Sequence, residues 1–161
     1  MNHPRICTPT TMKTILVPID LSDATDSVIE TACALALAFH AKIVLAHVVV
    51  MVANEIYPYV EDPESASNEL SLLQADLENE GVDVETSLVF GPPAICILEE
   101  AERINADCIV IGSHGHGALY NALTGGAASQ VLKNALRPVL IVPVARGKLG
   151  TGRLHLDKAH N

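Results

Sequence analysis

The chain has 161 residues and a formal net charge of −9, with only ten Lys and Arg. So few basic residues exclude the positive surface that binding to a phosphate backbone requires, and nucleic acid is not an expected partner. Hydrophobic residues make up 49% of the chain but aromatic residues only 3%. This composition predicts a single domain with an aliphatic core.

No apolar segment is long enough to span a bilayer, and residues 1–13 lack the apolar core of a signal peptide. The four cysteines show no C-x-x-C spacing, so neither a disulfide framework nor a zinc site is indicated. We therefore expect a protein of the reducing cytoplasm with no membrane partner.

Strand-like apolar runs alternate along the chain with helical patterns. Strands are expected over residues 14–19, 42–50, 84–88, 107–112 and 138–144. Strict alternation predicts right-handed βαβ units, and hence an α/β fold with a parallel sheet covered by helices on both faces.

Helix boundaries are indicated by capping residues. Ser22 is the expected N-cap of the first helix. The second helix is expected over residues 67–80, with Gly81 as its stop. Proline early in the third helix is tolerated because its missing N–H would have no partner there.

The pattern also divides the chain into a domain and two ends. We expect the domain over residues 12–144, with a flexible N-terminal segment over 1–11 and a flexible C-terminal tail over 145–161. Alternation of apolar and polar residues over 84–88 indicates an edge strand. His47, Cys33 and Cys108 are interpreted as core residues.

The segment between the fourth strand and the fourth helix carries the clearest chemical signal. Glycines occupy positions 112, 115, 117, 125 and 126 of this loop. Glycine lets a ligand approach the backbone closely, and amides at a helix start bind anions without Lys or Arg. A P-loop is excluded because Ala118 and Leu119 replace its Lys and Ser/Thr, and the first strand is not followed by the glycines of a dinucleotide fingerprint.

The spacing Gly112-x2-Gly115-x9-Gly125 resembles the Gly-x2-Gly-x9-Gly-Ser/Thr pattern of the universal stress protein family. Residues 15–20, 45–48, 107–112 and 138–142 are also similar to family signatures, so the resemblance covers roughly residues 12–144. It implies an open five-stranded parallel sheet in the order 3-2-1-4-5. It also implies a stress-response protein that binds ATP, ADP or AMP, with Mg²⁺ bound only alongside the phosphates.

The resemblance assigns a role to individual residues. Asp20 would accept a hydrogen bond from the adenine amino group, and Pro18, Ile19 and Val48 would line the base. Ribose and phosphates would lie on the glycine loop, at Gly112, Ser113, His114, Gly115, His116, Gly125, Gly126 and Ala127. Gly126 departs from the pattern, because the family has Ser or Thr at this position and so offers a hydroxyl to the terminal phosphates.

Several alternatives remain beside this reading. Asp20 also fits a purely structural role, tying down its loop, and His114 and His116 lack a third residue for a metal site. A family member without nucleotide, acting as a dimeric interaction module, is the first rival. A related adenine-nucleotide hydrolase is the second, although no base and nucleophile are paired in the sequence. Family members commonly form homodimers through the last strand, here residues 138–144, and act on a protein partner that the sequence does not identify.

Overall fold

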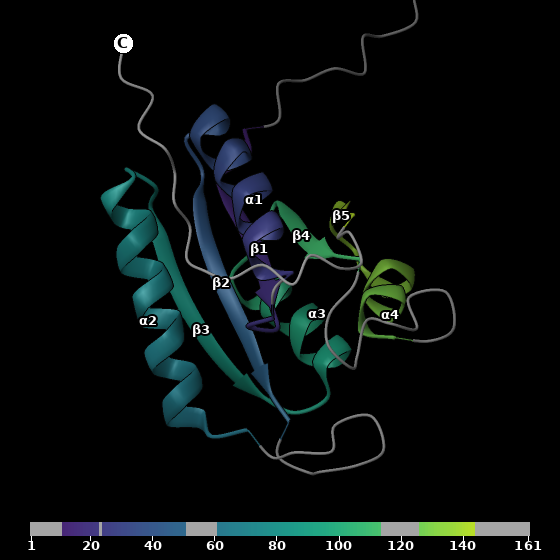
Figure 1. Cartoon of the computed structure of the whole chain (residues 1–161). Coiled ribbons are helices and arrows are strands. Elements are labelled where there is room, and N and C mark those ends of the chain that lie inside the picture. The colour runs from purple at the N-terminus through teal and green to yellow at the C-terminus, as the bar shows by residue number, and fades with distance from the viewer. Residues whose placement is uncertain (1–10, 23, 51–60, 114–125, 144–161) are drawn as a thin grey trace, which may run out of the picture.

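The computed structural model describes residues 11–22, 24–50, 61–113 and 126–143. Strands and helices alternate along the chain, as the apolar runs predict (Figure 1). The elements are β1 (Thr14–Ile19), α1 (Thr25–Phe39), β2 (Lys42–Val49), α2 (Pro63–Asn79), β3 (Val84–Phe90), α3 (Pro93–Arg103), β4 (Cys108–Gly112), α4 (Ala127–Asn134) and β5 (Val139–Val142).

All strand pairs are parallel, and the sheet has the order β3-β2-β1-β4-β5. β1 lies at the centre, where Ile15 is paired with Ile43 of β2 on one side and Cys108 of β4 on the other. This result confirms the α/β fold and the strand order. β3 and β5 form the two edges, as the alternating pattern over 84–88 predicts for β3.

The four helices cover the sheet in pairs, which gives three layers (Figure 1). α1 and α2 pack on one face, against side chains such as Ile15 and Leu45, whereas α3 and α4 pack on the other, against Leu16 and Ile109. Alternate side chains of a strand point to opposite faces, so the same strands supply both halves of the core. No described helix meets the length and apolarity that crossing a membrane demands.

Two helix starts differ from expectation. α2 begins at Pro63 rather than Ser67, because Asp62 caps it by accepting from the amides of Glu64 and Ser65, both at 3.3 Å. α1 begins at Thr25, and Ser22 closes the preceding turn instead of capping the helix: its carbonyl accepts from the Thr25 amide at 2.9 Å. Gly81, by contrast, has the φ of +85° expected of a helix stop.

Candidate functional site

The carboxyl ends of β1 and β4 lie side by side in the middle of the sheet. The helices that follow these strands leave in opposite directions: α1 packs on one face and α4 on the other. This divergence is the topological switch point of an open α/β sheet, where such folds bind ligands. It brings together the turn after β1 and the end of β4 at Gly112, two places to which the family resemblance assigned ligand contacts.

The turn after β1 is held by its own hydrogen bonds. Asp20 is exposed, and its Oδ1 accepts from the Ser22 amide at 3.1 Å and from the Ser22 hydroxyl. Leu21 between them has a φ of +56°, a left-handed conformation that is uncommon for a residue other than glycine. Asp20 therefore has the structural role that was left open for it. Its second oxygen, Oδ2, makes no hydrogen bond to any described residue.

The expected base-lining residues differ in accessibility. Pro18 and Ile19 are buried in the sheet, while Val48 is half-buried near the end of β2. Of the residues expected around the base, Val48 and Asp20 therefore have side chains that reach the surface.

A buried histidine contacts the backbone at the carboxyl end of β1. His47 is buried, as expected, with its Nδ1 2.9 Å from the Ile19 carbonyl oxygen and its Nε2 2.7 Å from Glu61 Oε2. Both ring nitrogens thus face oxygen atoms. His47 fixes the backbone immediately before Asp20. No pattern in the sequence indicated that Glu61 would be its partner.

The other wall of the site is formed by the end of β4 and the start of α4. Gly112 is buried, and the next amide, of Ser113, donates to the Val142 carbonyl at 2.8 Å. Gly126 is the N-cap of α4 and makes no side-chain cap, and Ala127 is half-buried as the first helical residue. The first amides of a helix lack intrahelical partners, so this start is suited to an anion.

The predicted loop residues His114, Gly115, His116 and Gly125 lie outside the described residues. Within the described ranges, no three His, Cys, Asp or Glu side chains are grouped in a way that would hold a metal ion.

Comparisons with known proteins agree with this geometry. Residues 11–143 match the universal stress protein family. The chain is 34% identical over 143 residues to the universal stress protein MJ0531 of Methanocaldococcus jannaschii, covering 81% of each protein.

Solved structures share the fold. The structure of protein MJ0577 superposes with a TM-score of 0.72 at 28% identity, covering 86% of this chain and all of that one. A universal stress protein solved in complex with cAMP gives a TM-score of 0.63 at 25% identity, covering 83% of this chain and 98% of that one.

Proposed function

Since the chain belongs to the universal stress protein family, we propose that it binds an adenine nucleotide (ATP, ADP or AMP) at the carboxyl edge of β1 and β4. We propose further that it acts in stress response through a ligand-dependent change of conformation or protein partner. One observation carries the proposal: an exposed carboxylate after β1 and an uncapped helix start after β4 flank the switch point. The relative solved with cAMP supports the class of ligand.

Each wall has its own task in the proposed complex. The Oδ2 of Asp20 accepts from the adenine amino group, while Oδ1 stays engaged with Ser22. Val48 and the adjoining backbone line the base. The phosphates lie on the amides of the glycine loop and of the α4 start, which need no Lys or Arg to hold them. Mg²⁺ accompanies the phosphates instead of occupying a protein-only site.

The same arrangement favours binding over turnover. The described walls hold no paired base and nucleophile, and no Lys or Arg to stabilise developing negative charge. We therefore propose a non-enzymatic role, with ATP turnover far below the ~10 per second of ordinary enzymes. Cytoplasmic residence accords with Cys33, Cys96 and Cys108 being free thiols.

Thermal unfolding tests nucleotide binding directly. A ligand at ~100 times its dissociation constant stabilises the native state by about 2.7 kcal/mol, which for a domain of this size raises Tm by roughly 5–10 °C. Mg-ATP should produce this shift and GTP a smaller one. If ATP, ADP, AMP and cAMP at millimolar concentrations all leave Tm unchanged, the proposal fails and the interaction-module role replaces it.

Two matched variants separate the structural role of Asp20 from its ligand role. Asp20→Asn keeps an Oδ1 acceptor for the turn but presents an amide donor where Oδ2 faced the adenine amine. Ser22→Ala removes two turn hydrogen bonds, the one that the hydroxyl donates to Asp20 and the one that it accepts from the Ala24 amide, but leaves both carboxylate oxygens in place. We expect Asp20→Asn to lose most of the ATP-induced shift with little change in unliganded Tm. Ser22→Ala should lower the unliganded Tm but keep most of the ATP-induced shift.

The open edge at β5 supports a second part of the proposal, a twofold homodimer formed through residues 138–144. Leu132, Leu136 and Leu140, on and beside this edge, are 56%, 85% and 38% exposed, and an exposed apolar edge strand invites pairing. Sedimentation at tens of micromolar should show a dimer. Leu140→Lys should yield a monomer, whereas Leu72→Lys, at a leucine on α2 that is 68% exposed, should not. A wild-type monomer would contradict the proposal.

A further inference from the structure

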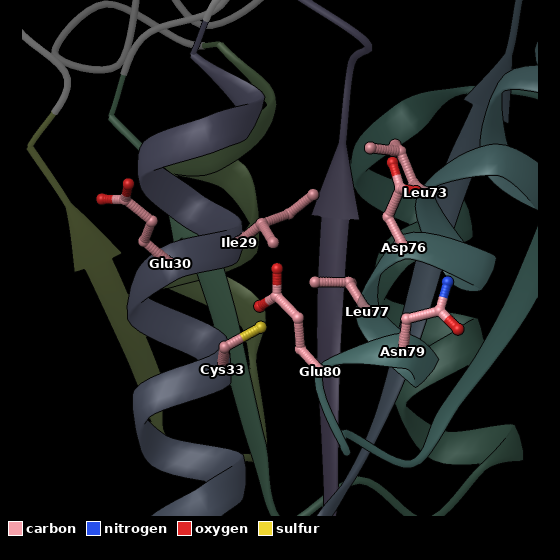
Figure 2. A pocket seen from close by; sticks show the side chains of 8 residues that line it. All are labelled: Ile29, Glu30, Cys33, Leu73, Asp76, Leu77, Asn79 and Glu80. Atoms are coloured by element: carbon pink, nitrogen blue, oxygen red, sulfur yellow. The ribbon is translucent and has the colours of Figure 1, made fainter. Parts of the chain in front are cut away.

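A hollow remote from the switch point lies between α1 and α2. Its volume is about 440 Å³. Figure 2 shows Ile29 of α1 and Leu77 of α2 pointing toward one another, with Cys33 and Glu80 facing each other nearby. We name it the α1–α2 groove, lined by Ile29, Glu30, Cys33, Leu73, Asp76, Leu77, Asn79 and Glu80. It combines an apolar floor with a rim of carboxylates.

The charge of this groove is uncompensated within the described ranges. α1 and α2 contain six Asp and Glu but no Lys or Arg, and no described cation pairs with Glu30, Asp76 or Glu80. The cations that do form ion pairs, Lys42, Arg103 and Arg137, pair elsewhere. The carboxyl end of α2 also opens on the groove without a basic residue in its last turn, and a helix end of this polarity favours a cation.

The pKa of the Cys33 thiol, which lies within the groove, reflects these neighbouring carboxylates. Burial, followed by the charges of Glu80 and Glu30, raises the pKa of Cys33 to about 11. Desolvation and nearby carboxylates both disfavour a thiolate, and the same carboxylates favour a cation placed beside them. The surroundings are thus suited to a ligand that is positively charged and partly apolar.

The chain itself contains a segment of this chemistry. Residues 145–161 hold four of the ten Lys and Arg and a single acidic residue, Asp157, and place leucines beside the cations, as in Lys148-Leu149 and Arg153-Leu154. We propose that this C-terminal segment docks in the α1–α2 groove of its own molecule, with its cations on the carboxylate rim and its leucines on the apolar floor. The groove is then an internal docking site, distinct from the nucleotide site.

Connectivity allows this contact. Val142, at the end of β5, packs in the same core cluster as α1, so the last described strand contacts one of the two helices that line the groove. Seventeen extended residues reach on the order of 55 Å, against a diameter of roughly 35 Å for a domain of this size. Tethering also gives the segment a millimolar effective concentration at the groove, which an unlinked cationic peptide has to match.

Disulfide trapping in the full-length chain tests the contact. The tail variant carries Leu154→Cys together with Cys7→Ser. Three native thiols then remain: Cys33, which is half-buried, and Cys96 and Cys108, which are buried. Diamide, a two-electron oxidant, joins two thiols that meet and is itself reduced. We expect an intramolecular bond from Cys33 to the introduced thiol, identified by peptide mass mapping. It should form at low salt and slow in ~0.5 M NaCl as charges are screened.

The matched control neutralises the groove without changing its shape, through Glu30→Gln, Asp76→Asn and Glu80→Gln. Removing Glu80 and Glu30 lowers the raised pKa of Cys33, which by itself would speed disulfide formation. Slower trapping therefore reports lost docking and not altered thiol chemistry. We expect it to slow by about tenfold, on the order of 1.4 kcal/mol.

A second control moves the target thiol to the opposite face, using Ile95→Cys with Cys33→Ser in the same tail variant. Ile95 is 54% exposed on α3, so a freely moving tail would meet this thiol at least as often as it meets Cys33. Because its raised pKa makes Cys33 the less reactive thiol, each trapping rate is divided by the rate at which the same thiol reacts with free glutathione under diamide. A corrected rate at Ile95→Cys as high as at Cys33, or trapping in the neutral groove as fast as in the acidic one, would overturn the proposal. Bonds formed only between molecules would also overturn it, and would assign the groove to the tail of a second copy.

Discussion

The helices on the two faces of the sheet pack against it with side chains of different size. The α1–α2 face buries large aliphatic residues, among them Ile29, Leu70 and Leu77 of its helices. The α3–α4 face is filled largely by alanine, with Ala94, Ala101 and Ala128 from its helices. Because each strand supplies both faces, the difference arises from the helices, and it makes the α1–α2 half of the core the more sensitive to truncation.

Charge distinguishes the faces as clearly as size does. On the α3–α4 face, Glu100 and Glu102 each pair with an arginine, Arg103 and Arg137. On the α1–α2 face the rim carboxylates have no such partner among the described residues. One face therefore neutralises its charge within itself, and the other presents it to whatever binds there. This contrast underlies the proposal that a cationic segment docks between α1 and α2.

The largest expected effect follows from the difference in packing. Leu70 of α2 is 2% exposed in its core cluster, whereas Leu98 of α3 is half-buried at the margin of the other. Leu70→Ala should lower the free energy of unfolding by about 3 kcal/mol and Leu98→Ala by about 1 kcal/mol, since the cost grows with the cavity left behind. Urea unfolding measures both. Equal losses would mean that the two faces pack equally tightly.

An intermediate effect is expected from the paired carboxylates. Glu100 is buried, and the hydrogen bonds from Arg103 at 2.6 and 2.7 Å hold its pKa below the ordinary value, with burial opposing. Glu100→Gln should cost about 1.5 kcal/mol at pH 7, because bonds to a charged group are lost. Glu102→Gln, at an exposed pair, should cost under ~0.5 kcal/mol.

The pH dependence supplies an independent measure of Glu100. Its lowered pKa means that its contribution is fully present above the unfolded pKa and disappears as pH falls through the folded one. Wild type should therefore lose more stability than Glu100→Gln between pH 6 and pH 3, measured by urea unfolding across that range. Parallel curves for the two proteins would show that Glu100 does not titrate differently on folding.

The sequence predicted the architecture because its signals are local. Apolar runs and capping residues lie within single elements, so strands, helices and their alternation can be read in order, and the family resemblance supplied the strand order. The first turn of α2 was missed because Pro63 appeared to belong to the preceding polar stretch, whereas Asp62 and Pro63 together form a helix start.

What could not be predicted depends on contacts across the fold. The bond between His47 and Glu61 joins residues from different segments. Leucine rarely adopts a left-handed conformation, so the sequence did not predict the positive φ of Leu21. The α1–α2 groove exists only once two helices lie side by side. For the proposed nucleotide site, Asp20 and Gly126 were selected through the family resemblance. The structure adds how Asp20 is held and that the α4 start is uncapped.

The smallest expected effect on stability concerns the α4 wall of the proposed nucleotide site, where Gly126 stands in place of the family's Ser or Thr. Its backbone, with φ of −67° and ψ of 171°, is open to any residue. Gly126→Ser should therefore fold normally, and as an N-cap serine should add a few tenths of a kcal/mol to stability. If the serine hydroxyl reaches the terminal phosphates, affinity for ATP should rise about three- to tenfold, the gain of roughly one hydrogen bond.

AMP and Gly126→Ala separate the possible causes of such a gain. AMP lacks the terminal phosphates, so its affinity should stay the same in Gly126→Ser, and titration calorimetry with both nucleotides measures the difference. Gly126→Ala adds the same Cβ without a hydroxyl, and should leave ATP affinity unchanged while losing the capping benefit. A gain for AMP equal to that for ATP, or an equal gain in Gly126→Ala, would contradict phosphate contact. Such a result would show that the substitution acts by ordering the start of α4, and that the α4 wall binds the nucleotide elsewhere than at its terminal phosphates.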